Sequence, residues 1–173
     1  MRKILIAVDL QKDFIDGSLG TKEAVAIIPA CVEKMKNWDR ENVYATRDTH
    51  PENYLETFEG RHLPVKHCIG GTEGWQLNKD IAPFVAPDHI IDKPGFGSLK
   101  LADLMKNINQ IDPVEIELIG LCTDICVVSN ALLLKAYLPD TVIRVDSSCC
   151  AGVTPELHEA ALATMRSCQI EVY

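Results

Sequence analysis

Residues 114–137 read VEIELIGLCTDICVVSNALLLKAY, and this stretch decides the fold class. Its first part, residues 114–119, is a short run rich in apolar and β-branched residues, which predicts a strand. Its second part, residues 127–137, has the length of a helix. A strand that passes through a short turn into a helix is the repeating unit of proteins built on a parallel sheet, in which the crossovers are right-handed.

The same alternation extends in both directions from this stretch. Residues 4–8 are continuously apolar rather than alternating, which predicts a strand buried on both faces. Further strands are expected at residues 42–45, 90–91, 142–145 and 170–172, and further helices at residues 23–40, 99–108 and 155–168. The pattern predicts an α/β fold of three layers, in which a doubly wound, mostly parallel sheet of about six strands has helices on both faces.

Residues 46–88 interrupt this alternation. They are rich in glycine, proline and histidine and show little periodicity. Loops of this length inside a compact domain are usually functional. No internal repeat, low-complexity tract or linker divides the sequence, so we expect a single domain over residues 1–173.

Charge and cysteine content limit the classes of partner and compartment. The formal net charge of −8 disfavours nucleic acid, which needs a basic face, and gives no support for an anionic membrane. The apolar run near the N-terminus is short, ends at Asp9 and lacks a small-residue cleavage site, so a buried strand explains it better than a signal peptide. The seven cysteines form no disulfide framework, and we interpret them as reduced thiols of a cytoplasmic protein.

Chemically useful side chains fall where the predicted strands end. Asp9 ends the first strand, Asp48 and His50 follow the second, Lys93 follows the third, and Cys126 lies after residues 114–119, where a helix begins. Open α/β sheets bind their ligands at the carboxyl ends of their strands. Structural residues should instead be scattered over both ends of the sheet, so this convergence predicts a functional site.

Taken singly, three of these residues have simpler explanations. Asp9 could cap a turn, Lys93 could be a solvated loop lysine, and Cys126 could be a small buried apolar residue. Together they suit covalent catalysis. A cysteine attacks as its thiolate, which a helix N-terminus and a neighbouring cation favour, and a carboxylate can take the thiol proton and pass it to a leaving amine.

The turn between strand and helix can complete such a site. The run of residues 120–126, GLCTDIC, can aim several backbone N–H groups at one point, as an oxyanion hole requires. Cys122 and Cys126 are four residues apart and lack the CxxC spacing of redox and metal pairs, which disfavours those interpretations.

A second group of residues has the spacing of metal ligands. Asp48 and His50 lie one residue apart, and His67 follows from a later loop, which gives three ligands with open positions, as in functional rather than closed structural sites. Glu59 lies between them and is a candidate fourth ligand. The alternative is that Asp48 caps a turn and the histidines are surface residues. Mixed Asp/His ligation suits zinc, manganese or iron, and we expect zinc first.

These motifs resemble those of nicotinamidases within the isochorismatase-like cysteine hydrolase superfamily. The resemblance rests on VDLQKDF at residues 8–14, DTH at 48–50, HCIGGTEG at 67–74, DKPGFGS at 92–98 and GLCTDICV at 120–127. It covers the whole chain, with the motifs in the family's order, and implies an isochorismatase-like hydrolase domain.

The resemblance implies a role for each site residue. Asp9, Lys93 and Cys126 match the catalytic triad, and Asp48, His50 and His67 match the metal ligands, with Glu59 where some members supply a further carboxylate. The backbone amides of Cys122 and Cys126 match the oxyanion hole, with a non-proline cis peptide at Leu121–Cys122. Phe14 matches an aromatic residue that packs on the substrate ring, and Leu121 and Phe96 are expected to contact the substrate. The resemblance further implies a homo-oligomer.

Two positions depart from the family's pattern. Cys122 stands where alanine is common, but only its backbone is needed. Pro64 stands where many members carry tryptophan or phenylalanine, which removes one wall of the ring site and costs about 0.5–1.5 kcal/mol of binding. Leu63, Trp75 or Phe96 could fill the gap, or the site could be wider.

The resemblance implies hydrolysis of nicotinamide to nicotinate and ammonia through a thioester, with the metal holding the pyridine nitrogen; pyrazinamide-type analogues would also react. Two alternatives stay open. One is a related cysteine amidohydrolase of another small amide, such as an N-carbamoyl or ureido compound, and the other is an idle member of the fold that only binds. The residues Asp48, His50 and His67 favour the first function, since the other branches generally lack them.

Overall fold

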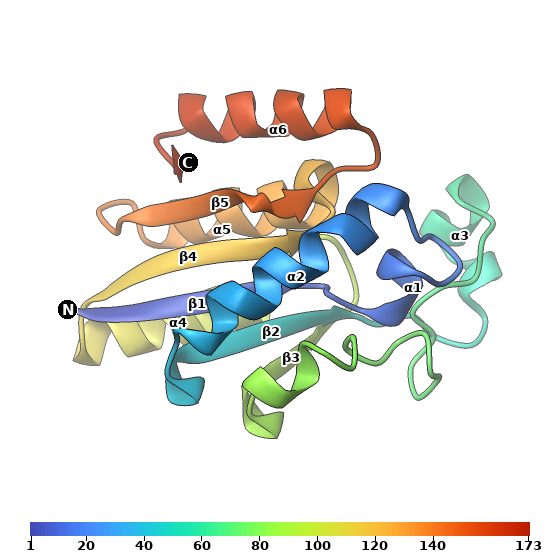
Figure 1. The fold of residues 1–173 in the computed structure, drawn as a ribbon, viewed down its shortest axis with the longest axis horizontal. Helices are drawn as coiled ribbons and strands as arrows, with labels where there is room; N and C mark the ends of the chain where they lie inside the picture. Colours follow the sequence, from blue (N-terminus) through green and yellow to red (C-terminus); the bar gives the residue numbers. More distant parts are fainter.

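A computed structural model describes all 173 residues as a six-stranded parallel sheet between two layers of helices (Figure 1). The strands are β1 (Arg2–Val8), β2 (Val43–Asp48), β3 (Ile90–Lys93), β4 (Val114–Leu121), β5 (Ile143–Ala151) and β6 (Glu171–Val172), and they lie in the order β3-β2-β1-β4-β5-β6. Every neighbouring pair is parallel, which confirms the predicted fold class.

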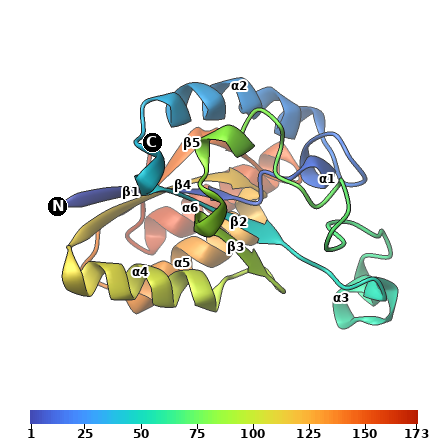
Figure 2. The same cartoon turned by 90° about the horizontal axis from the view of Figure 1, so that it is seen from below.

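The helices divide between the two faces of this sheet (Figure 2). The longer helices are α2 (Lys22–Lys36), α4 (Leu99–Ile111), α5 (Val128–Tyr137) and α6 (Pro155–Ser167), and the short ones are α1 (Lys12–Ile15) and α3 (Phe58–His62). One buried apolar cluster lies under α2, and a second lies under α4, α5 and α6. None of the helices combines the length and the hydropathy that crossing a bilayer requires.

Strand β1, in the middle of the sheet, shows why a strand covered by helices on both faces must be continuously apolar. Ile4, Ile6 and Val8 belong to the cluster under α4–α6, whereas Leu5 and Ala7 belong to the cluster under α2. Successive strand residues point to opposite faces, so a strand covered on both sides has no position for a polar residue until it ends.

Side-chain caps define where three long helices begin. The hydroxyl groups of Thr21, Ser98 and Thr154 accept hydrogen bonds from backbone N–H groups three residues ahead, at the starts of α2, α4 and α6. Such caps satisfy donors that the first helical turn leaves free. They fix how the loops at the carboxyl edge of the sheet enter the helices.

Several boundaries differ from the sequence-based expectation. β2 and β3 extend to Asp48 and Lys93, because these two residues still pair in parallel register. The helix expected over residues 23–40 ends at Lys36, where Asn37 donates its backbone and side-chain N–H groups to carbonyls of the last turn. β5 continues past residue 145 to Ala151 despite its polar residues, because it pairs again with the end of β4 after an irregularity.

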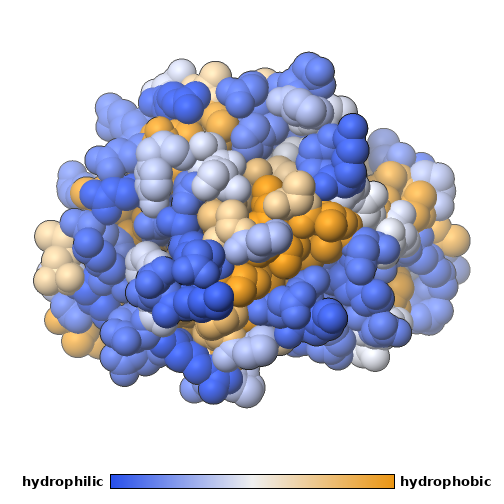
Figure 3. Space-filling model, viewed as in Figure 1, coloured by the Kyte–Doolittle hydropathy of each residue, from blue (hydrophilic) through white to orange (hydrophobic).

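The outer surface of α2 is not uniformly polar. Val25 is 49% exposed, and Figure 3 shows apolar side chains gathered on the face of the molecule that α2 crosses in Figure 1. Scattered exposed apolar residues are normal on soluble proteins.

A network of ion pairs ties α2 to the sheet. Lys34 Nζ lies 2.7 Å from Asp146 Oδ2 on β5, contacts Glu117 on β4, and lies 3.1 Å from the hydroxyl of Tyr173. Burial favours the neutral amine, but the hydrogen bonds that Lys34 donates to Asp146 and Glu117 outweigh it and raise the pKa of Lys34. Burial also disfavours the charged form of Asp146, but the bond from Lys34 outweighs it and lowers the pKa of that carboxyl.

Replacing Lys34 with methionine should destabilise the fold in a pH-dependent way. Two poorly exposed carboxylates lose their cation, which costs about 3 kcal/mol of unfolding free energy at neutral pH. A carboxyl group whose pKa is lowered by folding stabilises the folded state at pH values above its ordinary pKa, near 3.9. This stabilisation is lost as the pH falls through the lowered pKa, so the difference in unfolding free energy between the wild type and Lys34→Met should shrink in acid. Urea unfolding across this pH range measures it. Lys36→Met, which breaks an exposed pair with Glu33, is the control and should cost under about 1 kcal/mol at every pH.

Candidate active site and metal centre

The carboxyl ends of β1–β4 bring the predicted site residues to one edge of the sheet. Asp48 and Lys93 are the last residues of their strands, and Asp9 follows β1 with a φ of 48°. Gly120 has a φ of 126°, and a Cβ there would lie 2.0 Å from the carbonyl oxygen of Val8. Only glycine lets β4 pass β1 this closely before the turn that carries Cys126.

Cys126 lies inside a π-helical turn, Thr123–Val127, rather than at the first turn of an α-helix as expected. α5 begins only at Val128, because Ile125 and Val127 both donate their N–H groups to the carbonyl of Cys122. The predicted non-proline cis peptide is present at Leu121–Cys122. Single π-turns of this kind often occur at functional sites.

Asp9, Lys93 and Cys126 form a compact buried group. Lys93 Nζ lies 2.7 Å from Asp9 Oδ2 and 3.4 Å from Cys126 Sγ, and it donates to the carbonyl of Gly95 at 2.9 Å. Lys93 Nζ therefore bridges the carboxylate of Asp9 and the sulfur of Cys126. None of the three residues is more than 4% exposed. The group therefore contains a thiol, a carboxylate and a cation that contacts both of them.

Burial decides the protonation states in this group. It raises the pKa of the Cys126 thiol well above its usual value, and the charge of Asp9 adds to this rise while Lys93 opposes it. It also raises the pKa of Asp9, against the attraction of Lys93. Burial alone would lower the pKa of Lys93, but the electrostatic attraction of Asp9 and Cys126 outweighs it. The pKa of Lys93 is therefore raised, and the side chain stays a cation. Cys126 is therefore a protonated thiol in this resting state, and it needs a base such as Asp9 to accept its proton when it attacks.

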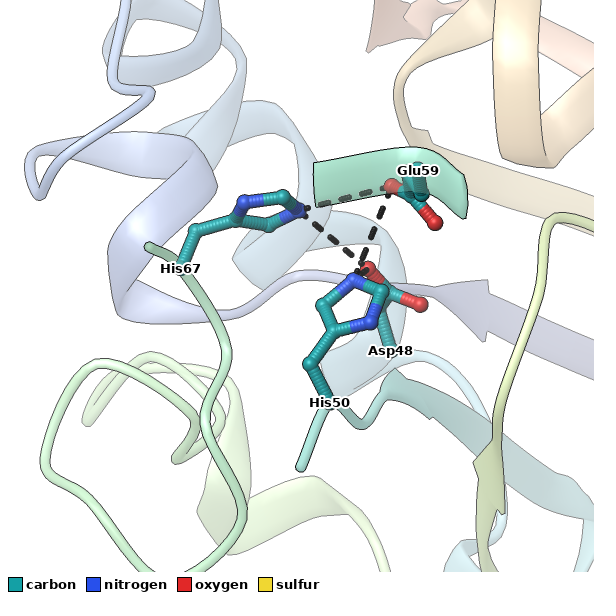
Figure 4. A group of neighbouring side chains, drawn as sticks. All are labelled: Asp48, His50, Glu59 and His67. Carbon is teal, nitrogen blue, oxygen red and sulfur yellow. Dashed lines mark ion pairs between the residues drawn. The ribbon is translucent and has the colours of Figure 1, made fainter. Parts of the chain in front are cut away.

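Asp48, His50, Glu59 and His67 form a second cluster, whose side chains point toward one another in Figure 4. One donor atom from each residue lies within 4.8 Å of the other three. Asp48 Oδ2 is 2.8 Å from His50 Nε2 and 3.6 Å from His67 Nε2, and Glu59 Oε1 is 3.7 and 3.8 Å from these nitrogens. The predicted ligands and the candidate fourth ligand are thus brought together, although their role in binding metal stays a prediction.

Two details of this cluster fit a bound divalent cation. His50 Nε2 is buried yet makes no hydrogen bond, which is unusual for a polar atom. His67 Nδ1 lies 2.8 Å from the carbonyl oxygen of Val65, which accepts its proton and leaves the lone pair of Nε2 directed into the cluster. Two imidazole nitrogens together with two carboxylates are a donor set that suits zinc, manganese or iron.

Gln11 fixes Asp48 in place, and sequence reasoning missed it. This fully buried amide accepts from the backbone N–H of Asp48 at 2.7 Å and donates to its carbonyl and to that of Trp75, both at 2.9 Å. Its position beside a buried strand was the only available signal, because its partners are backbone groups.

Asn130 plays the same part for Cys126. From α5, its Nδ2 donates to the carbonyls of Cys126 at 2.8 Å and Phe96 at 3.1 Å, while its Oδ1 accepts from the N–H of Ser98 at 2.9 Å. It therefore ties the turn that carries the thiol to the loop that follows Lys93. An asparagine four residues after Cys126, in a largely apolar helix, was the signal that could have found it.

A cavity of about 310 Å³ connects the two clusters. Cys126 opens into it, as do Asp48, Glu59 and His67 from the second cluster. The three residues predicted to contact the substrate, Phe14, Leu121 and Phe96, all line this cavity. Its volume lies within the range of small-molecule sites.

The gap left by Pro64 is filled in part. Pro64 is exposed and does not line the cavity, but its neighbour Leu63 does, together with Phe96. Trp75, the third candidate, lies elsewhere: its indole N–H donates to Thr49 and its ring stacks under Arg47 at 3.5 Å. Leu63 is 39% and Phe96 49% exposed, so this side of the cavity stays open.

Comparisons with known proteins give one family. The model of the isochorismatase domain matches residues 3–173. A Bacillus subtilis relative, named as the uncharacterised isochorismatase family protein PncA, is 30% identical over 94% of this chain and 93% of its own length. The crystal structure of the B. subtilis nicotinamidase/pyrazinamidase PncA has a TM-score of 0.82 with 27% identity, covering 99% of both chains. A pyrazinamidase from Pyrococcus horikoshii, solved in complex with zinc, has a TM-score of 0.80 with 27% identity, covering 100% of this chain and 99% of that one.

Proposed function

The chain belongs to the isochorismatase family, and from this membership and the geometry of its site we propose that it is an amidohydrolase that converts nicotinamide to nicotinate and ammonia. One observation carries the proposal: Cys126 lines the same cavity as Asp48, Glu59 and His67. A small aromatic amide with a ring nitrogen could meet both groups at once. The solved nicotinamidase and pyrazinamidase structures of similar fold add support.

The proposed reaction forms a thioester on Cys126. Asp9 accepts the thiol proton as Sγ attacks the amide carbon, and it then gives that proton to the leaving nitrogen, so that ammonia departs. Asp9 next takes a proton from water, which attacks the thioester, and the proton returns to Sγ as nicotinate leaves. Lys93 remains a cation and holds Asp9 beside the thiol. Backbone N–H groups of Cys122 and Cys126 would stabilise the oxyanion, each worth about 2.7–4 kcal/mol.

Asp48, His50 and His67, with Glu59 as a fourth ligand, would hold one divalent cation, which we propose to be zinc. When bound, the cation supplies a Lewis acid that holds the pyridine nitrogen, directly or through water. Burial alone would raise the pKa of Asp48, but its surroundings, including the charge of Lys93, lower it, so Asp48 is an ionised carboxylate that can serve as a ligand.

The proposed function is tested by measuring ammonia release from nicotinamide by the zinc-loaded protein. We expect turnover, and chelation should raise KM about tenfold or more, because a pyridine nitrogen without its partner costs about 1–3 kcal/mol. Reloading with zinc, manganese and iron identifies the preferred ion. No ammonia from nicotinamide, with release from an N-carbamoyl or ureido compound, would instead favour the related amidohydrolase, and no release from either would favour the idle member.

Replacing Gln11 with alanine should weaken zinc binding about 10–100-fold, because Asp48 loses both bonds that fix its backbone. Competition with a colorimetric chelator measures the affinity without recourse to activity. Asn78→Ala is the control. Asn78 lies on the long loop of residues 46–88, which also carries Glu59 and His67, but its side chain accepts from the backbone N–H of Asp80 and does not contact the metal cluster, so this variant should bind zinc with unchanged affinity. Equal affinities in Gln11→Ala and the wild type would contradict the role assigned to Gln11.

Two further expectations stay proposals. A cytoplasmic location agrees with seven cysteines that are all free thiols. A homo-oligomer is expected from the family resemblance, and sedimentation velocity on the purified protein checks it.

A further inference from the structure

The cavity is longer than a single aromatic ring requires. It runs along the carboxyl edge of the sheet from Asp48, at the end of β2, to Gly152 and Val153, just after β5. β2, β1, β4 and β5 are consecutive in the sheet, so the cavity crosses three strand spacings, about 14 Å. A ring with its carboxamide, placed between the metal cluster at the end of β2 and Cys126 after β4, leaves the β5 end of this span uncovered.

The remaining part of the cavity, which we call the β5 lobe, is apolar. Its walls are Leu19, Thr21, Ala24, Ile125, Gly152 and Val153. No ionisable side chain is among them, and the one hydroxyl, that of Thr21, already accepts from the N–H of Ala24 at 3.0 Å. By contrast, Asp48, Glu59, His62 and His67 gather at the opposite end of the same cavity. An occupant must therefore be polar at one end and apolar at the other.

The space beside the leaving nitrogen is closed. Asp9, which would protonate that nitrogen, is fully buried, Lys93 is 1% exposed, and neither residue lines the cavity. An alkyl or aryl group on the amide nitrogen would have to enter this packed group. The leaving group that fits is ammonia, whereas any added bulk must be on the acyl part.

We propose that the substrates are primary aromatic carboxamides whose ring carries an apolar substituent that occupies the β5 lobe, and that Val153 limits its size. This inference rests on the proposed amidohydrolase function and extends it from nicotinamide to bulkier acyl groups. Val153 is suited to this role because it lines the lobe just after β5 and is 46% exposed, so a larger side chain can be introduced there without disturbing the buried core.

The first test compares kcat/KM of the zinc-loaded protein for nicotinamide, for 4-phenyl- and 5-phenylnicotinamide, whose substituents point away from the ring nitrogen, and for N-methylnicotinamide. We expect at least one phenyl derivative to exceed nicotinamide about tenfold, and N-methylnicotinamide to be at least a hundredfold poorer. If neither phenyl derivative exceeds nicotinamide, the lobe does not bind substrate and the inference is wrong. If N-methylnicotinamide reacts as well as nicotinamide, the claim that the space beside the leaving nitrogen is closed is wrong. Inactivity toward all four compounds would instead overturn the proposed function itself.

The second test fills the lobe. Val153→Trp should lower the ratio of kcat/KM for the better phenyl derivative to that for nicotinamide at least tenfold. Leu157→Trp is the matched control, because Leu157 is also 46% exposed and lies four residues further on but does not line the cavity; its ratio should equal that of the wild type. A ratio that stays constant in Val153→Trp, with circular dichroism showing a folded protein, contradicts the assignment of Val153.

Discussion

Replacing Cys126 with alanine should lower kcat for amide hydrolysis by at least about 10⁴-fold, the scale on which removal of a covalent nucleophile acts. The reason is geometric. Cys126 Sγ lies 3.4 Å from Lys93 Nζ, and the same ammonium group lies 2.7 Å from Asp9 Oδ2, so this thiol has a cation in contact and a carboxylate beside that cation. Ammonia release under saturating nicotinamide measures the loss, and mass spectrometry of acid-quenched wild-type protein should place the acyl group on the peptide that contains Cys126.

Cys122 is the informative comparison, because its thiol lines the same cavity. Burial first, and then Asp124, raise the pKa of this thiol to about 12, and neither Asp9 nor Lys93 bonds to it. Its proposed contribution is a backbone N–H group, which alanine retains, so Cys122→Ala should lose less than about tenfold. If Cys126→Ala keeps more than a small fraction of wild-type activity while Cys122→Ala does not, the assignment of the thioester to Cys126 is wrong.

The catalytic and metal clusters could be anticipated from sequence because they depend on topology. Asp9, Asp48, Lys93 and Cys126 are far apart in the chain, but a parallel sheet brings the carboxyl ends of its strands to one edge. Once the alternation of strands and helices is recognised, these residues must meet. The register of β2 with β3 shows this, because Asp48 and Lys93 pair with each other at the carboxyl ends of the two strands.

The residues that hold these clusters in place could not be anticipated in the same way. Gln11 and Asn130 bond to backbone groups of Asp48 and Phe96, 37 and 34 residues away. Any residue type offers the same backbone partner, so the pairing leaves no signature in the sequence. Protonation states were also out of reach, because burial, which raises the pKa of Cys126, is a property of the packed fold.

The second large effect is expected at Asp9. Asp9→Asn removes the only proton acceptor of the thiol and should lower kcat about 10²–10⁴-fold, the contribution typical of a general acid–base group. Burial, and to a lesser extent Asp48, raise the pKa of Asp9 against the pull of Lys93. Since the reaction needs the ionised carboxylate, wild-type kcat/KM should decline as pH falls through a value above 3.9, the usual aspartate pKa. The residual activity of Asp9→Asn should lack this acid limb.

Thr46 separates this explanation from a merely structural one. Its hydroxyl donates to Asp9 Oδ1 at 2.6 Å, a bond that favours the carboxylate and lowers the pKa of Asp9. Thr46→Val keeps the shape of the side chain but removes the bond, so the acid limb of kcat/KM should move to higher pH by about one unit, with little change on the plateau. If Asp9 were purely structural, Thr46→Val should lower the plateau of kcat/KM without moving its acid limb, because loss of packing does not alter a proton affinity. An unmoved limb in Thr46→Val would therefore require a different general base.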